Sequence, residues 1–165
     1  MISLKIIDIK AFMSSLLVQP IFDNFLLSEL DIITFNHFNI SGKLNTSWYN
    51  SDELELLQGR VYSKWSEIKP TAFNLIKGNK TPSSFKIVFL LSPENTSKIL
   101  NKNGLSFKLE EINGLFLNIK FEHNILTLIT GTSLRTFTMD KSLEHEWDAN
   151  MKTFLKHYEI AFEEL

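Results

Sequence analysis

Hydrophobic residues recur along the chain at two spacings, and these predict strands in alternation with helices. Strand spacing, or a short apolar run bounded by turn residues, is expected at 2–7, 22–30, 32–44, 84–91, 115–121, 125–130, 134–138 and 158–163. Helical spacing is expected at 9–17, 51–58, 66–77, 93–101 and 143–157. Residues 29–31 are expected to form the turn of a hairpin between the second and third strands.

Capping residues mark several of the helix starts. Asp8 and the Ser92-Pro93 pair each stand just before a helical pattern, and Asn50 with Glu53 three residues later forms a capping-box sequence. Pro70 falls within the helix expected at 66–77. Because proline is tolerated in the first turn of a helix, that helix is expected to begin at or just before Pro70.

Two parts of the chain follow the same order of elements. Residues 3–44 and 84–138 both read strand, helix, strand, strand, and they begin SLKII and SFKIV. Five loosely similar residues also arise by chance, so the matching order is the better argument for a duplicated β-α-β-β unit. We expect one α+β domain over 1–165, with 45–83 as a helical insertion. Its antiparallel sheet should carry the helices on one face.

Composition limits the classes of function. The chain has 165 residues, 44% hydrophobic and 22% charged, a net charge of −2 and no cysteine. Disulfides, zinc thiolate sites and cysteine nucleophiles are therefore excluded. No apolar stretch is long enough to span a membrane, and charged residues interrupt the N-terminal apolar run, so we expect a cytoplasmic protein. Only Arg60 and Arg135 are arginines, which counts against sequence-specific DNA recognition.

Five stretches resemble a known family along nearly the whole chain. They are SLKIIDIKAFM, FDNFLLSE, YSKWSEIKP, FNLIKGNKTP and TGTSLRTFTMDKSLEHEWD. They are similar to a family of uncharacterised bacterial proteins, a domain of unknown function. This resemblance implies no activity and transfers no functional residue.

A second resemblance concerns architecture alone. A duplicated β-α-β-β unit resembles the repeated unit of sliding DNA clamps, in which basic helices line the inside of a ring. The corresponding helices here offer Lys10, Lys98 and Lys102, with Glu94 beside them. No clamp motif is matched, and the insertion at 45–83 departs from the clamp pattern. The resemblance implies a clamp-like topology as an expectation.

Candidate catalytic chemistry is sparse. His145 and Asp148 lie three residues apart on the last expected helix, a spacing at which two side chains can share a metal ion. No third ligand is indicated, so a solvated helix face explains the pair better. Neither a nucleophile-elbow nor a phosphate-loop motif occurs. We therefore expect no catalytic residue, metal or cofactor.

One region alternates basic and aromatic residues. Lys64, Trp65, Lys69, Lys77 and Lys80 fall within the insertion and its final loop. Such a pattern can hold single-stranded nucleic acid through backbone charge and base stacking. The alternative is that Trp65 anchors the insertion to the core while the lysines are solvated, and this alternative is favoured because tryptophan is mostly buried.

The sequence thus favours a non-enzymatic binding or scaffold module. Its partner is expected to be a protein, or nucleic acid bound weakly and without sequence preference, and homo-oligomers stay open. The alternative is an enzyme whose site is built from scattered residues, around His145 and Asp148. Convergent polar groups in a pocket would favour the enzyme.

Overall fold

A computed structural model describes residues 1–165 and contains seven strands and five α-helices. The strands are β1 (Ser3–Ile6), β2 (Leu26–Ile33), β3 (His37–Ser41), β4 (Ser84–Leu90), β5 (Ile112–Glu122), β6 (Ile125–Leu134) and β7 (Phe162–Glu164). The helices are α1 (Ile9–Leu17), α2 (Ser51–Leu57), α3 (Trp65–Ile76), α4 (Pro93–Lys102) and α5 (Ser142–His157). All strands join one sheet in the order β3-β2-β4-β5-β6-β1-β7, and every neighbouring pair is antiparallel.

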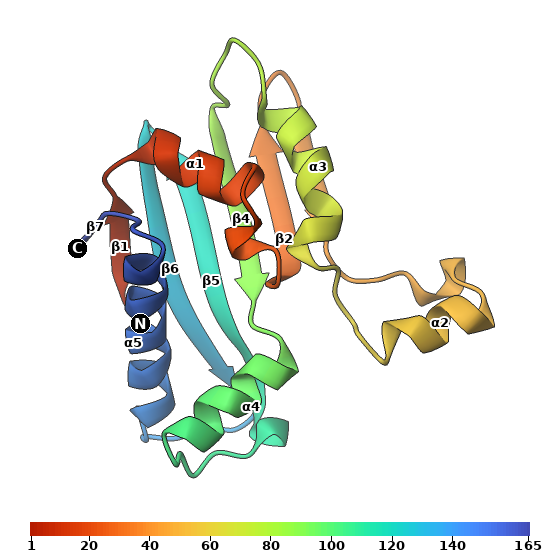
Figure 1. Ribbon diagram of the computed structural model, residues 1–165, viewed down its shortest axis with the longest axis vertical. Coiled ribbons are helices and arrows are strands. Elements are labelled where there is room, and N and C mark those ends of the chain that lie inside the picture. Colours follow the sequence, from red (N-terminus) through yellow and green to blue (C-terminus); the bar gives the residue numbers. More distant parts are fainter.

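Helices cover only one face of this sheet. In Figure 1, α1, α3 and α5 lie over the near face, and α4 closes its lower end. The buried side chains of these helices and of the strands form one cluster of 29 residues. Leu143, Trp147, Met151 and Leu155 of α5 belong to this cluster, and Phe154 packs against it half-buried. The expected α+β class, with an antiparallel sheet and helices on one face, is therefore confirmed.

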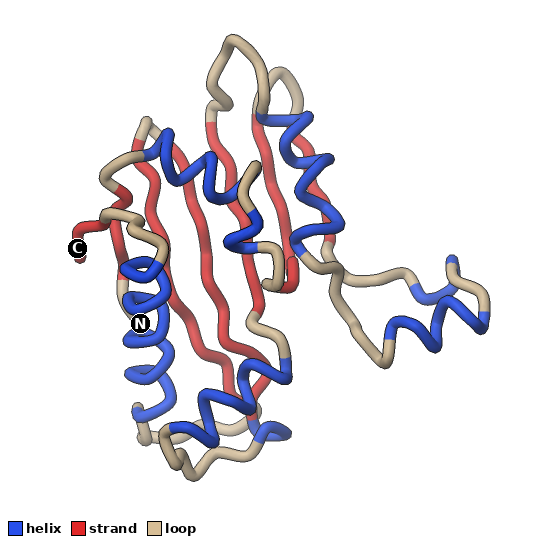
Figure 2. The backbone as a smooth tube through the Cα atoms, viewed as in Figure 1, coloured by secondary structure: helices blue, strands red, loops and turns tan.

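No helix lies behind the sheet, and this uncovered surface is called the far face (Figure 2). Side chains alternate along a strand, so every second residue of β5 points away from the core. Leu115, Leu117 and Ile119 are buried in the core cluster, whereas Phe116 and Asn118 between them are half-buried on the far face.

None of the helices is long and apolar enough to span a membrane.

Three expected boundaries were wrong. Residues 29–31 lie inside β2, and the hairpin turn is at 34–36, because Glu29 and Asp31 are the outward-facing positions of a strand rather than turn residues. Helix α3 begins at Trp65, ahead of Pro70, which lies inside it. The separate strand expected at 134–138 does not form, since β6 continues from Ile125 to Leu134.

The clamp-like topology is not confirmed. Both expected halves contain a strand, a helix and two strands, but they are arranged differently in the sheet. In the second half, β4, β5 and β6 are neighbours. In the first half, β1 pairs with β6 and β7, and β4, β5 and β6 separate it from β2. The halves are thus not equivalent units of the sheet, although a shared origin stays a prediction.

Candidate functional site

A segment of the insertion projects from the body of the protein, and residues 45–62 of this segment are called the arm. Its two ends are held together as an antiparallel stem. The Leu44 amide donates to the Val61 carbonyl at 2.8 Å, and the Ser63 amide donates to the Gly42 carbonyl at 2.7 Å. The stem fixes where the arm leaves the sheet, and Figure 1 shows α2 standing clear of the other helices.

Local signals in the sequence shape the arm. The capping box predicted for α2 is present, because the Glu53 amide donates to Asn50 Oδ1 at 2.9 Å and the Asn50 amide donates to Glu53 Oε2 at 2.8 Å. The helix ends where Gln58 and Gly59 adopt positive φ angles of 51° and 76°. Glycine adopts that conformation at little cost, so Gly59 turns the chain back toward the stem.

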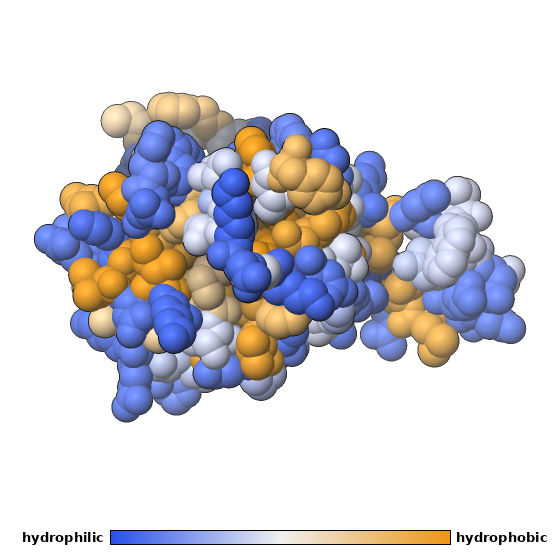
Figure 3. Space-filling view, turned by 90° about the horizontal axis from the view of Figure 1, so that it is seen from above, coloured by the Kyte–Doolittle hydropathy of each residue, from blue (hydrophilic) through white to orange (hydrophobic).

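Large hydrophobic side chains of the arm are exposed. No residue of α2 is buried, and the exposed fractions of Trp48, Leu56 and Val61 are 77%, 82% and 51%. Figure 3 shows the arm as a lobe standing off from the body, with hydrophobic atoms on part of its surface. A helix of seven residues is too short to be stable in water on its own. The arm therefore presents apolar surface that the protein's own core does not use.

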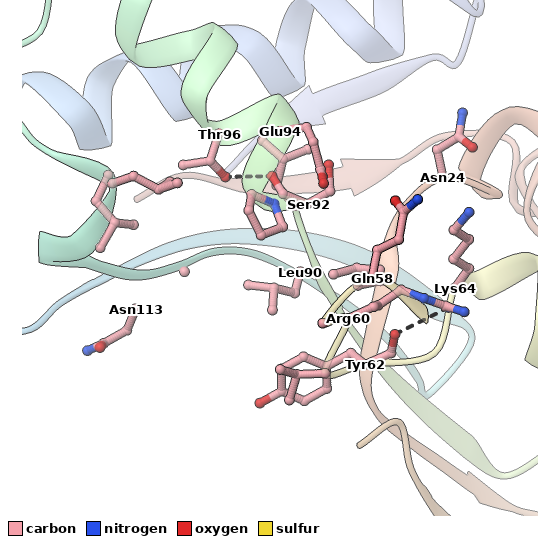
Figure 4. Close-up of a pocket in the computed structure, with 18 of the residues that line it drawn as sticks. Asn24, Gln58, Arg60, Tyr62, Lys64, Leu90, Ser92, Glu94, Thr96 and Asn113 are labelled. Atoms are coloured by element: carbon pink, nitrogen blue, oxygen red, sulfur yellow. Dashed lines mark hydrogen bonds between the residues drawn. The ribbon is translucent and has the colours of Figure 1, made fainter. Parts of the chain in front are cut away.

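A cavity of about 750 Å³ lies between the arm and the body, and it is called the arm cleft. Its apolar wall comes from the arm through Leu56, Leu57 and Tyr62, and from the sheet through Leu26 and Leu90. Figure 4 shows Leu90 at the centre, with the start of α4 on one side and Tyr62 on the other. The cleft thus has an apolar lining made by elements that are far apart in the sequence.

Polar groups surround this apolar wall. Both arginines of the chain, Arg60 and Arg135, line the cleft together with Lys64 and Glu94. The Arg60 guanidinium donates to the Tyr62 carbonyl at 3.4 Å and pairs with the Glu67 carboxylate. The side chains of Lys64, Glu94 and Arg135 make no ion pair, so they are free to meet a bound group.

The Arg60–Glu67 pair has an electrostatic consequence at the root of the arm. Burial by itself would raise the pKa of the Glu67 carboxyl. The hydrogen bonds from Arg60 and from the Lys64 amide outweigh burial and hold this pKa below its ordinary value. Glu67 therefore stays ionised, and its ion pair with Arg60 joins the end of the arm to the first turn of α3.

The structure separates the residues of the expected basic and aromatic surface. Trp65 is fully buried, and its Nε1 donates to the Leu16 carbonyl at 2.8 Å. Lys69 pairs with the Asp23 carboxylate at 2.6 Å. Lys64 lines the arm cleft, whereas Lys77 and Lys80 are exposed beyond the end of α3. Trp65 thus occupies the core position that was the favoured alternative, and no base can stack on it.

His145 and Asp148 do not form a shared site. His145 is exposed on α5 and no hydrogen bond joins it to Asp148. The Asp148 carboxylate instead accepts hydrogen bonds from the Thr130 hydroxyl and the Met1 amine. No group of three or more histidine, aspartate or glutamate side chains is placed to hold a metal ion. Asp148 thus has a structural role, since it binds Thr130 and the N-terminal amine, whereas the side chain of His145 makes no hydrogen bond.

The sequence identified the insertion as a region of interest but not the arm as its exposed part. The available signal was the combination of Trp48 with three leucines in a short acidic helix. That pattern indicates an amphipathic helix, which is usually read as core-facing.

Comparison with known proteins adds a family but no activity. Residues 15–163 match the model of a family of unknown function, DUF5721. No curated protein and no solved structure matches the chain. Any function must therefore be argued from the geometry described above.

Proposed function

The chain belongs to the family of unknown function DUF5721, and from its geometry we propose that it is a non-enzymatic module that binds a protein through the arm and the arm cleft. The proposed compartment is the cytoplasm, which suits a chain without cysteine. The exposed apolar arm carries the proposal.

The side chains of the arm are those that contribute most to protein interfaces. Tryptophan is enriched among the residues whose truncation costs the most binding energy, and Trp48 is 77% exposed. Burying one leucine or a similar side chain contributes about 1.5–3 kcal/mol. Trp48, Leu56 and Val61 together could therefore supply a large part of the energy of a specific complex. A surface of this kind has no evident use in the isolated chain.

The arm cleft supports the same proposal. Protein interfaces combine an apolar centre with a polar rim. Here Leu56, Leu57 and Tyr62 of the arm supply apolar surface. The nearly buried Leu26 and Leu90 form the floor of the cleft, and Lys64, Glu94 and Arg135 lie around it. The cleft has polar groups, but none forms a nucleophile–base pair or a metal site. Binding is therefore favoured over catalysis.

Site-specific photo-crosslinking in the native host tests the proposal. A benzophenone amino acid at Leu56 should capture a protein, whereas the same group at Phe35, an exposed residue of the distant 34–36 turn, should not capture it. The captured protein should then bind the purified chain and fail to bind a Leu56→Asp variant. Equal capture from both positions, or none from Leu56, would refute a docking role for the arm.

Weak nucleic-acid binding is the less favoured candidate. It is supported by Lys77 and Lys80, which are exposed and make no ion pair. Each neutralised phosphate contributes about −0.9 to the slope of log affinity against log salt, so these two lysines and Lys64 would give about −2.7. Fluorescence anisotropy with single-stranded and duplex oligonucleotides at low salt tests this function. An anisotropy that does not change as protein is added would exclude nucleic-acid binding.

A further inference from the structure

The strand β3 forms an open edge of the sheet, and it pairs only with β2. The Gly42 amide, just after β3, donates to the Ser28 carbonyl at 2.9 Å, and the bonded residues of an antiparallel ladder alternate along each strand. The backbone groups of Phe38 and Ile40 therefore also bond to β2. The residues between them direct their amides and carbonyls away from the sheet, and these residues are His37, Asn39 and Ser41.

The chain itself makes no hydrogen bond to these outward backbone groups. The returning strand of the arm stem bonds to Gly42 and Leu44, so it lies on the β2 side of the edge. On the far face, Asn39 Nδ2 donates to the Asp31 carboxylate at 3.0 Å, and His37 Nε2 lies 2.6 Å from the same carboxylate. These contacts hold both side chains toward β2. The outer edge of β3 thus presents three amides and three carbonyls without a partner.

The strand β3 also lacks the features that protect an edge from pairing. Natural sheets block free edges with charged side chains, proline or a bulge. The sequence of β3, HFNIS, has no lysine, arginine, carboxylate or proline, and its register with β2 is unbroken. The opposite edge strand, β7, has only three residues and carries Glu163 and Glu164. The β3 edge is therefore the one suited to pair with a further strand.

We propose that the β3 edges of two copies of this chain pair antiparallel across a two-fold axis at Asn39, so that the two sheets become one. The outward groups are placed symmetrically, since His37 and Ser41 lie two residues to either side of Asn39. Asn39 then lies opposite Asn39 of the second copy, and His37 lies opposite Ser41 of the second copy. All six outward groups of each copy form hydrogen bonds in this register. The inference is independent of the proposed function, because β3 lies outside the arm and the arm cleft.

The side chains of β3 fit the same register. Phe38 and Ile40 are half-buried on the near face, and Phe38 of one copy lies opposite Ile40 of the other. Directly opposed apolar side chains stabilise a pair of strands, whereas like charges would destabilise it. Phe35, which is 88% exposed with its ring 5.9 Å from that of Phe38, lies opposite Lys43 of the second copy. The pairing thus covers apolar surface at its centre and at both ends.

Pairing through β3 limits the assembly to a dimer, because it uses the β3 edge of both copies and leaves none free. The charged β7 edges stay at the outside of the joined sheet. The contact is smaller than the roughly 20–30 residues on each side of a standard protein interface, so we expect a dissociation constant of about 1–100 μM.

Sedimentation velocity with two variants of one residue tests the pairing. Asn39→Pro removes an outward amide at the centre of the contact but leaves the ladder with β2 intact, because that amide does not bond to β2. Asn39→Ala is the control, since it loses the same side-chain contacts and keeps the amide. The wild-type chain and Asn39→Ala should dimerise alike, whereas Asn39→Pro should dimerise at least about tenfold more weakly. A wild-type chain that is monomeric up to about 300 μM, or equal dimerisation of the two variants, overturns the inference.

Disulfide formation between introduced cysteines tests the register. The chain has no cysteine, so each introduced thiol is the only one in its copy. Bonded pairs of an antiparallel ladder have Cα atoms about 5.5 Å apart, which suits a disulfide. Asn39→Cys should therefore oxidise to a covalent dimer, and a mixture of His37→Cys with Ser41→Cys should give the mixed dimer.

The matched control for the register is His37→Cys alone. Two copies of residue 37 lie roughly 14 Å apart along the paired strands, which is too far for a disulfide. This variant should stay monomeric under the same oxidation. A yield from His37→Cys equal to that from Asn39→Cys, or no covalent dimer of Asn39→Cys, overturns the inference.

Discussion

Removing the arm should leave the fold almost as stable as before. Lys43 and Tyr62 form an isolated antiparallel bridge, and Leu44 bonds to Val61 just beyond it. A two-residue Asn-Gly turn joins strands in this register, so it can replace residues 45–60 and close the stem as a hairpin. The replacement deletes Trp48 and α2 but keeps Tyr62 and the whole of α3.

The expected change in the free energy of unfolding follows from the contacts that are lost. The half-buried Leu57 contributes about 1 kcal/mol, and the partly exposed Arg60–Glu67 pair contributes about 0–1 kcal/mol. Shortening the loop from roughly sixteen residues to two lowers the entropic cost of closing the loop by about 1.8 kcal/mol, which stabilises the fold. The sum lies within about 2 kcal/mol of zero.

Urea denaturation followed by circular dichroism measures this change. The control is Trp65→Ala, a core truncation that should cost about 3–5 kcal/mol. An arm-replaced protein that is destabilised by more than about 3 kcal/mol would refute the reasoning, because the arm would then support the fold. An arm-replaced protein that stays stable is the result expected of an arm that docks a partner and does not support the fold.

Three further predictions concern the root of the arm. Gly42→Ala should destabilise the protein by about 1–3 kcal/mol in urea, because the added Cβ would lie 1.7 Å from the Leu27 carbonyl oxygen; an unchanged midpoint would contradict this. Trp65→Phe should cost about 1–3 kcal/mol, because the buried Leu16 carbonyl loses its donor, and a cost near zero would argue against that hydrogen bond. The lowered pKa of Glu67 stabilises the fold above its ordinary value of 4.5, and this stabilisation is lost as the pH falls through the lower folded pKa. The difference in the free energy of unfolding between wild type and Glu67→Gln should therefore shrink between pH 6 and pH 3. A constant difference would contradict a stabilising Arg60–Glu67 pair.

Helices with strong capping signals were predicted well from the sequence. Ser92 and Pro93 start α4, and Asn50 with Glu53 starts α2, as expected. Capping depends on side chains within one turn, so a single sequence contains the needed information. The hairpin turn was misplaced because Glu29 and Asp31 were read as turn residues. They are polar because they face away from the core.

The order of the strands could not be predicted in the same way. Pairing of β1 with β6 joins residues more than a hundred positions apart, and nothing local in SLKI specifies that partner. The exposed arm was missed for a related reason. The pattern of α2 indicates an apolar side, but only the three-dimensional structure shows that the core leaves this side uncovered. Trp65 was the opposite case, since its burial followed from the usual behaviour of tryptophan.

Acrylamide quenching of tryptophan fluorescence tests most directly whether the arm is covered by a protein. Of the three tryptophans, Trp48 is 77% exposed, whereas Trp65 and Trp147 are 0% and 2% exposed. We predict that quenching of the wild-type chain falls toward that of a Trp48→Phe variant when the protein captured at Leu56 is added. The Leu56→Asp variant should stay strongly quenched in the presence of the same protein. Quenching of Trp48 that is unchanged by the captured protein would contradict the account.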